Sequence, residues 1–479
     1  MIAVLRDRIS KEAGRWPASL SLCVLLLTLI ALPAAAQERR VPATRPEIEL
    51  SFAPLVKRVA PAVVNIYAKR VVRQAQSPLF DDPVFRRLFG DRPPPRERIQ
   101  NSLGSGVIVQ PEGLVVTAHH VIEGATEIKV ALHDRREFDA TVVRDDTRTD
   151  LAILRIDAGS ERLPFLELRD SDDAEVGDLV LAIGNPFGVG QTVTSGIVSA
   201  LARTAIGKSD FSYFIQTDAA INPGNSGGAL VTMDGRLLGI NTAIYSRTGT
   251  SAGVGFAVPS NMVATVLQGA VSGGRVVRPW FGASGQSMTS ELAASLHTAR
   301  PAGVLIDDVH PGGPAENAGL KPGDIVTAVN GREVDDMDAL RFRIATQPVG
   351  GTAKLQVVRA GREFALSLPL QRAPELPPRE ATKLAGGNPL AGATVANLSP
   401  ALAEELSLSD ALRGVIVTAV DRGSLAGRTG LRPGDMILAV NGTETKSVAA
   451  LKTRLAATSG RWQIAIQRGD RVMSVVIEG

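Results

Sequence analysis

The sequence has very few of the residues that cross-link proteins or hold metal ions. Its single cysteine, Cys23, lies in an N-terminal apolar run, and the whole chain has only five histidines. Without further cysteines the rest of the chain can form neither disulfides nor thiolate metal sites. No HExxH pair is present, so a zinc enzyme has no support. We therefore expect no metal and no other cofactor.

Aromatic residues and charge of one sign are also scarce. Aromatics make up 4% of the chain and the formal net charge is +3, part of which lies in residues 1–36. No Lys/Arg-rich block and no interleaving of basic and aromatic residues occurs in the remainder. A nucleic-acid partner is therefore not expected. No nucleotide-binding signature is evident, so we expect an activity independent of ATP.

The N-terminal apolar run is short. It extends from Leu20 to Leu32, follows a basic stretch, and is followed by small residues at Ala34–Ala36. Spanning a bilayer takes roughly 18–20 apolar residues. The pattern predicts a signal peptide over residues 1–36, cleaved after Ala36, with export to the periplasm and no stable membrane span. An uncleaved anchor is the alternative.

The chain is long enough for two to four domains. Short apolar runs separated by turn residues recur from Val63 to Val258, which is typical of an all-β barrel or sandwich. A helix is expected over residues 260–273, with Ser260 as its N-cap. The interruption at residues 74–100 is too long for an ordinary hairpin connection. Its apolar residues have the spacing of one helical face: Phe85, Leu88 and Phe89.

The second half contains an internal repeat. The stretch Ala318–Gly331, with Gly-Leu-Lys-Pro-Gly-Asp at its centre, returns as Thr429–Gly442. Each copy follows an apolar strand and precedes a helix-like run, over residues 337–346 and 448–457. Two copies indicate paired modules, because a solenoid needs about three or more units. The Pro- and Gly-rich residues between the copies read as a linker.

One glycine-rich turn carries the clearest chemical signal. Asn222–Ala229 places Ser226 among three glycines between two apolar runs. Glycine allows a turn that aims consecutive backbone amides at one point, as an oxyanion hole requires. A plain surface turn is the alternative for this motif taken alone.

Upstream residues complete a catalytic set. His120 ends an apolar run and Asp150 precedes another, so a base, an orienting carboxylate and a nucleophile occur in the order His120, Asp150, Ser226. A serine hydroxyl becomes nucleophilic when an imidazole takes its proton, and the carboxylate holds the imidazole's tautomer. Gly224, Asn225 and Ser226 are expected to form the oxyanion hole, with the backbone amides of Gly224 and Ser226 as its candidate donors. From the residues alone, His119 could also be the base.

The motifs resemble those of the HtrA (Do-like) family of chymotrypsin-fold serine proteases with C-terminal PDZ modules. The resemblance covers the chain from about residue 50 to its end, and the matching stretches are Gly104–Ile108, Thr117–Val121, Thr149–Ala152, Gly224–Gly228 and Gly253–Pro259. It implies a mainly β fold: a chymotrypsin-like double β-barrel followed by two α+β PDZ domains. It also implies that His120, which directly precedes the Val-Ile pair, is the catalytic histidine.

Domain limits follow from this resemblance. We expect the protease domain over residues 37–274, with a long regulatory loop at about 72–100. The first PDZ domain is expected over 275–372, a linker over 373–388 and the second PDZ domain over 389–479. In relatives the regulatory loop can reach a neighbouring subunit's active site; an apolar patch in a loop without that role is the alternative.

The resemblance also implies binding residues. It places Ile221 and Asn241, Thr242, Ala243 and Ile244 around the S1 pocket, where the lack of a carboxylate favours small aliphatic P1 residues. Ile221 could instead be a core residue only. In the first PDZ module, Trp280, Phe281, Gly282 and Ala283 match the loop that binds a peptide carboxylate. The second module offers Leu390–Ala393, and the sequence leaves open whether it binds ligand or is purely structural.

The expected function is that of an ATP-independent periplasmic serine endopeptidase. Its expected partners are unfolded or misfolded polypeptides and exposed C-terminal peptides, within a homotrimer or a multiple of trimers, and chaperone activity is compatible with the same design. Two alternatives remain at this stage. One is a regulatory protease that makes one specific cut after PDZ sensing, and the other is a latent holdase or scaffold.

Overall fold

The computed structural model describes most of the chain from residue 51 onward. The described residues are 51–73, 97–185, 190–203, 213–222, 224–244, 253–271, 276–296, 298, 300–406, 408, 412–457, 460–469 and 471–477. The expected signal peptide and the expected helical face of Phe85, Leu88 and Phe89 lie outside them. In the described part, no helix is long and apolar enough to cross a membrane.

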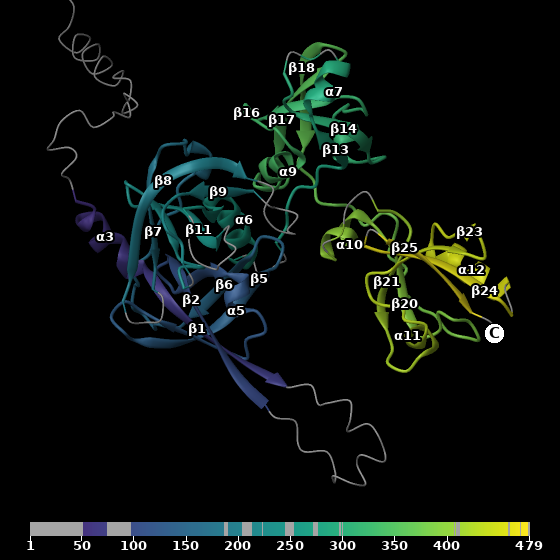
Figure 1. Ribbon diagram of the computed structural model, residues 1–479, viewed down its shortest axis with the longest axis horizontal. Helices are drawn as coiled ribbons and strands as arrows, with labels where there is room; N and C mark the ends of the chain where they lie inside the picture. Colours follow the sequence, from purple (N-terminus) through teal and green to yellow (C-terminus); the bar gives the residue numbers. More distant parts are fainter. Residues whose placement is uncertain are drawn as a thin grey trace, which may run out of the picture. The chain divides into compact units, whose positions relative to one another are not determined.

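The first six strands close into a barrel. A short helix α3 (Ala53–Val59) and a 3-10 turn (Ala60–Ala62) lead into it. The strand order is β1-β2-β3-β6-β5-β4, and Figure 1 shows β1 and β2 extending together beyond the barrel. The strands are β1 (Val63–Arg73), β2 (Glu97–Gln110), β3 (Leu114–Ala118), β4 (Glu127–Ala131), β5 (Glu137–Asp146) and β6 (Leu151–Ile156). Fully buried β-branched and leucine side chains such as Ile66, Val115 and Leu154 fill this barrel.

The next six strands close into a second barrel, in the order β10-β11-β12-β9-β8-β7. They are β7 (Leu179–Gly184), β8 (Thr192–Arg203), β9 (Phe214–Thr217), β10 (Ala229–Thr232), β11 (Leu237–Ile244) and β12 (Gly255–Pro259). Helix α6 (Ser260–Val271) follows, and it begins at the serine that the sequence predicts as N-cap. Two closed antiparallel barrels are the chymotrypsin-like arrangement expected from the sequence, and this prediction is confirmed.

The first repeat copy folds into an α+β module. Its sheet has the order β13-β14-β15-β17-β18, with β16 paired to β15. The strands are β13 (Ala283–Ser287), β14 (Val304–Val309), β15 (Ile325–Val329), β16 (Arg332–Glu333), β17 (Thr352–Arg359) and β18 (Arg362–Pro369); the helices are α7 (Ser290–Ser295), α8 (Pro314–Asn317) and α9 (Met337–Ala345). The repeated motif is a turn that leads into β15, as the sequence indicates.

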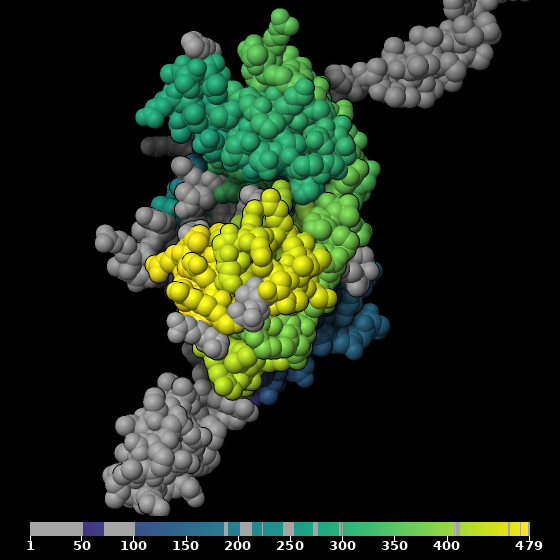
Figure 2. Space-filling model, turned by 90° about the vertical axis from the view of Figure 1, so that its right-hand side faces the viewer, coloured from purple at the N-terminus to yellow at the C-terminus, as the bar shows by residue number. Residues whose placement is uncertain are grey.

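The second copy repeats this design with one additional strand. Its order is β19-β20-β21-β22-β24-β25, with β23 paired to β22. The strands are β19 (Thr382–Lys383), β20 (Ala393–Asn397), β21 (Val415–Val420), β22 (Met436–Val440), β23 (Thr443–Glu444), β24 (Trp462–Arg468) and β25 (Arg471–Ile477); the helices are α10 (Pro400–Glu405), α11 (Leu425–Arg428) and α12 (Val448–Ala457). Figure 2 shows the atoms of this module, yellow-green to yellow, as one closely packed body. Strand β19 lies within residues 373–388, where the sequence predicts a linker.

Candidate active site

His120 and Asp150 lie on neighbouring turns of the first barrel. His120 belongs to the single helical turn α5 (His119–Ile122) after β3, and Asp150 stands directly before β6. The Nδ1 atom of His120 lies 2.8 Å from Oδ2 and 3.0 Å from Oδ1 of Asp150, and the His120 amide donates to Oδ1 at 3.0 Å. Asp150 has a φ of 56°, a left-handed conformation that aspartate tolerates better than most residues. The backbone turn therefore aims this carboxylate at the imidazole.

Asp150 is held in its charged form. Burial opposes the charge, but the hydrogen bond and charge of His120, the Thr242 hydroxyl and the His120 amide outweigh it, so that the pKa of Asp150 is lowered. A carboxylate that stays ionised can accept the Nδ1 proton of His120 and leave Nε2 free of a proton. This is the tautomer that a general base requires.

Thr242 joins the two barrels at the site. Its hydroxyl, on β11 of the second barrel, donates to Oδ2 of Asp150. Its carbonyl accepts a hydrogen bond from the Ser226 hydroxyl at 3.2 Å. Among the described residues, Ser226 Oγ thus donates to Thr242 and not to His120. One residue of the second barrel contacts both the carboxylate and the candidate nucleophile.

The turn that carries Ser226 is fixed by Ser105 of β2. Ser105 Oγ donates to the Gly224 carbonyl at 2.6 Å and accepts from the Asn185 amide at 2.8 Å, while its own amide donates to the Ser226 carbonyl at 2.8 Å. A Cβ on Gly227, whose φ is 81°, would lie 2.2 Å from the Ser105 carbonyl oxygen and 2.3 Å from Thr117 Oγ1. The glycine after the serine is thus required by the close approach of β2.

The amides of the turn have different partners. The Asn225 amide donates to the Asn222 carbonyl at 2.9 Å. In the part of the chain that the structure describes, the amides of Gly224 and Ser226 donate to no carbonyl. The Asn225 side chain is buried beside Gly184. Of the three residues assigned to the oxyanion hole by sequence, Gly224 and Ser226 therefore have amides available, whereas the amide of Asn225 is engaged within the turn.

The residues expected around the S1 pocket differ in burial and in what they contact. Ile221 is 1% exposed, belongs to the core of the second barrel and packs against Gly255. Asn241 is fully buried and braces the serine turn, because its carbonyl accepts from the Gly227 amide and its amide donates to the Gly228 carbonyl. The backbone of Ala243 and Ile244 continues β11, and their side chains lie outside the described residues.

His119, the neighbour of His120, has a different partner. Its Nδ1 lies 2.5 Å from Oδ1 of Asp145 at the end of β5, and its amide donates to the Asp150 carbonyl at 3.0 Å. The hydrogen bond to Asp145 is the main reason that the pKa of His119 is raised. His119 therefore braces the loop that carries Asp150 and does not share its carboxylate.

The loop expected to bind a peptide carboxylate lies at the start of β13. Gly282 has a φ of 74°, and its carbonyl accepts from the His310 amide at 2.8 Å. Trp280 packs edge-on against His310 with ring centroids 4.9 Å apart. Among the described residues, the amides of Phe281 and Gly282 donate to no backbone carbonyl. Ala283 is buried under the loop.

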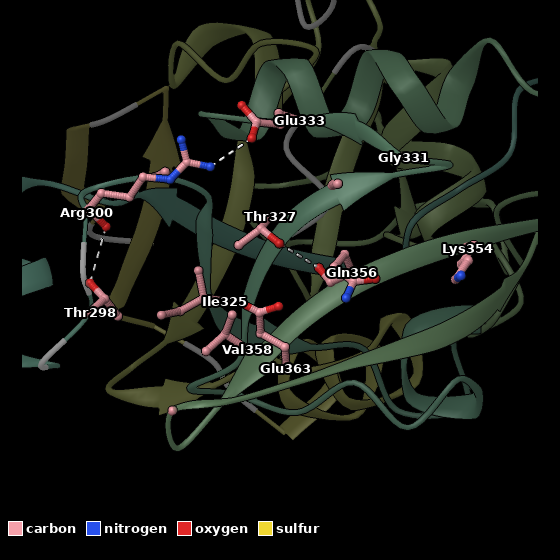
Figure 3. A pocket seen from close by; sticks show the side chains of 13 residues that line it. Thr298, Arg300, Ile325, Thr327, Gly331, Glu333, Lys354, Gln356, Val358 and Glu363 are labelled. Carbon is pink, nitrogen blue, oxygen red and sulfur yellow. Dashed lines mark hydrogen bonds and ion pairs between the residues drawn. The ribbon is translucent and has the colours of Figure 1, made fainter.

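A separate hollow of about 690 Å³ lies over β15 to β18 of the first module (Figure 3). Ile325 and Val358 contribute apolar surface, and Arg300 pairs with Glu333 at 2.8 Å. None of the residues Trp280 to Ala283 lines it. It is therefore distinct from the loop expected to bind a peptide carboxylate. Across the described residues, no group of three or more His, Cys, Asp or Glu is arranged to hold a metal ion.

Comparisons with known proteins agree with this architecture. Residues 104–240 match the trypsin-like peptidase domain family, and residues 305–359 and 416–461 each match the PDZ domain family. A probable periplasmic serine endoprotease DegP-like from Chlamydia trachomatis is 39% identical over 87% of this chain and 83% of its own length. The periplasmic serine endoprotease DegP of Salmonella typhimurium is 37% identical over 94% of this chain and 97% of its own length.

Solved structures give the same picture. The HtrA-type protease AlgW with a tripeptide is 41% identical, covers 68% of this chain and 98% of its own chain, and has a TM-score of 0.51. The same protease with a decapeptide is 45% identical with a TM-score of 0.50, over 68% of this chain and 99% of its own.

The sequence reasoning missed two contacts of this site. Ser105 lies within a quoted motif, but its support of the Gly224 carbonyl joins residues 119 positions apart. Thr242 is expected around the S1 pocket, and the sequence gives no sign that its hydroxyl also contacts Asp150, 92 positions away. For both Ser105 and Thr242, the only indication in the sequence is a small hydroxyl residue in a buried stretch of strand.

Proposed function

The chain belongs to the HtrA (Do-like) family of trypsin-like serine proteases with PDZ domains and is a serine-type endopeptidase, and from this premise we propose that Ser226, His120 and Asp150 carry its catalysis. The contact of His120 Nδ1 with the Asp150 carboxylate at 2.8 Å carries the proposal. It supports His120 over His119 as the base, because the His119 ring is paired with Asp145.

The proposed chemistry is two-step acyl transfer. Ser226 Oγ attacks the carbonyl carbon of the scissile peptide bond while His120 Nε2 takes its proton, and Asp150 stabilises the imidazolium that forms. The amides of Gly224 and Ser226 receive the negative charge that develops on the carbonyl oxygen. Each such donor is worth roughly 100- to 1,000-fold in rate. His120 then protonates the leaving amine, and water repeats the sequence on the acyl-enzyme.

The hydrogen bond from Ser226 Oγ to Thr242 points to a regulated enzyme. A serine that donates to a carbonyl must turn toward His120 before attack. This supports a protease whose site is completed when substrate binds. The same observation is compatible with the alternative of a regulatory protease, because a quality-control protease and a regulatory protease of this kind would each need an activating step.

Substrate, location and assembly are part of the same proposal. Unfolded or misfolded exported polypeptides are the proposed substrates, with small aliphatic P1 residues, and the first PDZ module is proposed to bind exposed C-termini through Trp280–Ala283. The proposed location is the periplasm, after cleavage of residues 1–36, and the proposed assembly is a homotrimer or a multiple of trimers. Names of relatives such as the periplasmic serine endoprotease DegP support this reading.

Casein digestion by the wild type and by Ser226→Ala tests the proposal. The wild type should degrade casein without ATP, and the variant should retain binding but lose cleavage by several orders of magnitude. Sizing with and without casein follows the assembly in the same samples. Cleavage that survives in Ser226→Ala contradicts the assigned nucleophile, and a wild type inactive over a wide temperature range favours the holdase alternative.

A further inference from the structure

The two PDZ modules differ at the sheet edge where a peptide would bind. In the first module β13 is the edge strand, and no described strand pairs with its outer side. In the second module β19 pairs antiparallel with the equivalent strand β20, with Thr382 opposite Val395 and Lys383 opposite Thr394. A peptide binds a PDZ module by adding a strand to this edge. In the second module that position is therefore already filled by the chain itself.

Leu384 ends this pairing at the carboxylate-binding loop. Its carbonyl accepts from the Gly392 amide at 2.8 Å, and its amide donates to the Ala393 carbonyl at 2.8 Å. Gly392 corresponds to Gly282 of the first module, since each has a positive φ and a carbonyl that accepts an amide from the residue after the next strand, Asp421 or His310. The Leu384 carbonyl therefore takes the place of a ligand's carboxylate oxygen.

The Leu384 side chain completes the likeness to a bound peptide. It is 4% exposed and belongs to the same apolar cluster as Leu451 and Leu455 of helix α12. A cavity of about 510 Å³ beside it is lined by residues 382–388 and by Leu455. The segment thus lies next to α12 as well as on β20, which are the two walls of a PDZ peptide groove.

We propose that residues 379–384 form an internal ligand that closes the groove of the second PDZ module, and that the external ligand of this groove is a polypeptide C-terminus ending in a leucine-like residue. The inference deepens the proposed function by assigning a ligand class and a closed state to the second module. The inference rests on the PDZ fold and not on the catalytic residues. Peptide binding is therefore measured in the Ser226→Ala variant, where the result does not depend on the proposed protease mechanism.

The contacts that keep residues 379–384 in the groove are weak enough for a free peptide to displace the segment. Beyond the strand pairing and the buried Leu384 side chain, the segment is held by the backbone amide of Asn397, which donates to the Arg379 carbonyl at 2.8 Å, and by two ion pairs, Lys383 with Asp421 and Arg379 with Glu405, both at 2.7 Å. The ion pair of Lys383 is between two well-exposed side chains, and such pairs contribute little. A tethered ligand acts at an effective concentration on the order of 1 mM. With an intrinsic Kd of about 10 μM for the segment itself, a free peptide would bind the closed groove roughly 100-fold more weakly than an open one.

The first experiment opens the groove. The full chain carrying Ser226→Ala is titrated into a fluorescein-labelled peptide, Glu-Ala-Thr-Lys-Leu with a free carboxylate, and anisotropy is recorded. Leu384→Ala should add a binding phase roughly 10- to 100-fold tighter than any the parent shows for this module. Leu376→Ala, at an exposed leucine just before the segment, is the matched control and should behave as the parent. The same peptide with an amidated C-terminus should give no added phase.

The second experiment locks the segment into the groove with a reversible disulfide. It tests the proposal without Leu384→Ala, and so remains decisive if that variant unfolds. Lys383→Cys and Thr394→Cys are placed on facing residues, in a background with Cys23→Ser. Paired residues of antiparallel strands lie about 4.5–5.5 Å apart at Cα, within disulfide range. Oxidation should abolish the weak second phase seen at high peptide concentration, and dithiothreitol should restore it. Equal binding by the oxidised and reduced forms, or a Leu384→Ala isotherm identical to that of the parent, would overturn the proposal.

Discussion

Ser105 Oγ donates a 2.6 Å hydrogen bond to the carbonyl of Gly224, and so fixes the turn that carries Ser226 to a strand of the opposite barrel. The same hydroxyl accepts from the Asn185 amide. The Ser105 amide also donates to the Ser226 carbonyl, so Ser105 holds both residues whose own amides are the proposed oxyanion donors. Ser105 is thus a positioning residue for the proposed oxyanion hole.

Ser105→Ala should lower kcat more than it raises KM. Removing the hydroxyl leaves the buried Asn185 amide and the half-buried Gly224 carbonyl without their partner, which costs about 1–3 kcal/mol and frees the turn to rotate. We expect a fall in kcat of about tenfold or more, measured with a chromogenic peptide under saturating conditions. Ser102→Ala on the same strand is the control and should leave both constants unchanged. A change confined to KM would contradict the positioning role.

Thr242→Val should narrow the active pH range from the acid side. The pKa of Asp150 is lowered partly by the Thr242 hydroxyl, against the opposing effect of burial. A group with a depressed pKa keeps its charge until the pH falls through that pKa, so loss of the hydroxyl should make Asp150 take up a proton at a higher pH. The profile of kcat/KM against pH should then fall earlier on acidification, and Thr242→Ser should restore it. Superimposable acid limbs would show that the hydroxyl has no such effect.

The repeated, local features of the fold were predictable from sequence. The short apolar runs that recur from Val63 to Val258 form the strands of the two barrels, among them β4, β6 and β9. Such strands can be recognised in the sequence because their residues either alternate in burial, as in β4, or form a short and almost continuously buried run, as in β6 and β9. The repeat likewise predicted paired modules, because a turn, a strand start and a helix recur in the same order.

Contacts between distant residues were not predictable. Nothing near Thr242 in the sequence indicates that its hydroxyl reaches Asp150, since only the joining of two barrels brings them together. Strand β19 was hidden for another reason. It has two residues, too few to show a period, and its surroundings are rich in Pro, Gly and charge, which is typical of a linker.

The His119–Asp145 pair should make stability depend on pH. The pKa of His119 is raised above 6.5, chiefly by the hydrogen bond to Asp145, and Asp150 and Glu123 add to this. Because the folded-state pKa is the higher one, the stabilisation is complete below the unfolded value and is lost as the pH rises through the raised pKa. His119→Asn should therefore be destabilising at about pH 6 and nearly neutral at about pH 9.

Denaturant unfolding at a series of pH values measures this difference. His133→Asn, at an exposed histidine, is the control and should follow the wild type throughout. A His119→Asn deficit that stays constant or grows with increasing pH would rule out the charged pair as its source.

Each PDZ module has one buried aspartate carboxylate paired with an arginine. We expect each pair to stabilise its own module against unfolding and to have no effect on the other module. Asp324 and Asp435 are both fully buried at the end of the repeated motif. Arg359 Nε and Nη2 reach Asp324 at 2.5 and 2.6 Å, and Arg468 reaches Asp435 at 2.6 and 2.7 Å. Charged, two-point hydrogen bonds of this kind are the strong ones. Asp→Asn at either position removes the charge and sets an amide against the guanidinium, a loss of about 2–3 kcal/mol.

The two modules can be followed separately in a chain that starts at residue 37 and so lacks Trp16, because Trp280 lies in the first module and Trp462 in the second. In a Trp462→Phe background, Asp324→Asn should lower the unfolding midpoint reported by Trp280 fluorescence. In a Trp280→Phe background, Asp435→Asn should lower the midpoint reported by Trp462. Asp335→Asn, at an exposed position of the first module, is the control and should shift neither. If Asp324→Asn left the Trp280 midpoint unchanged, the repeated aspartate would be dispensable, and the motif would owe its form to the Pro-Gly turn alone.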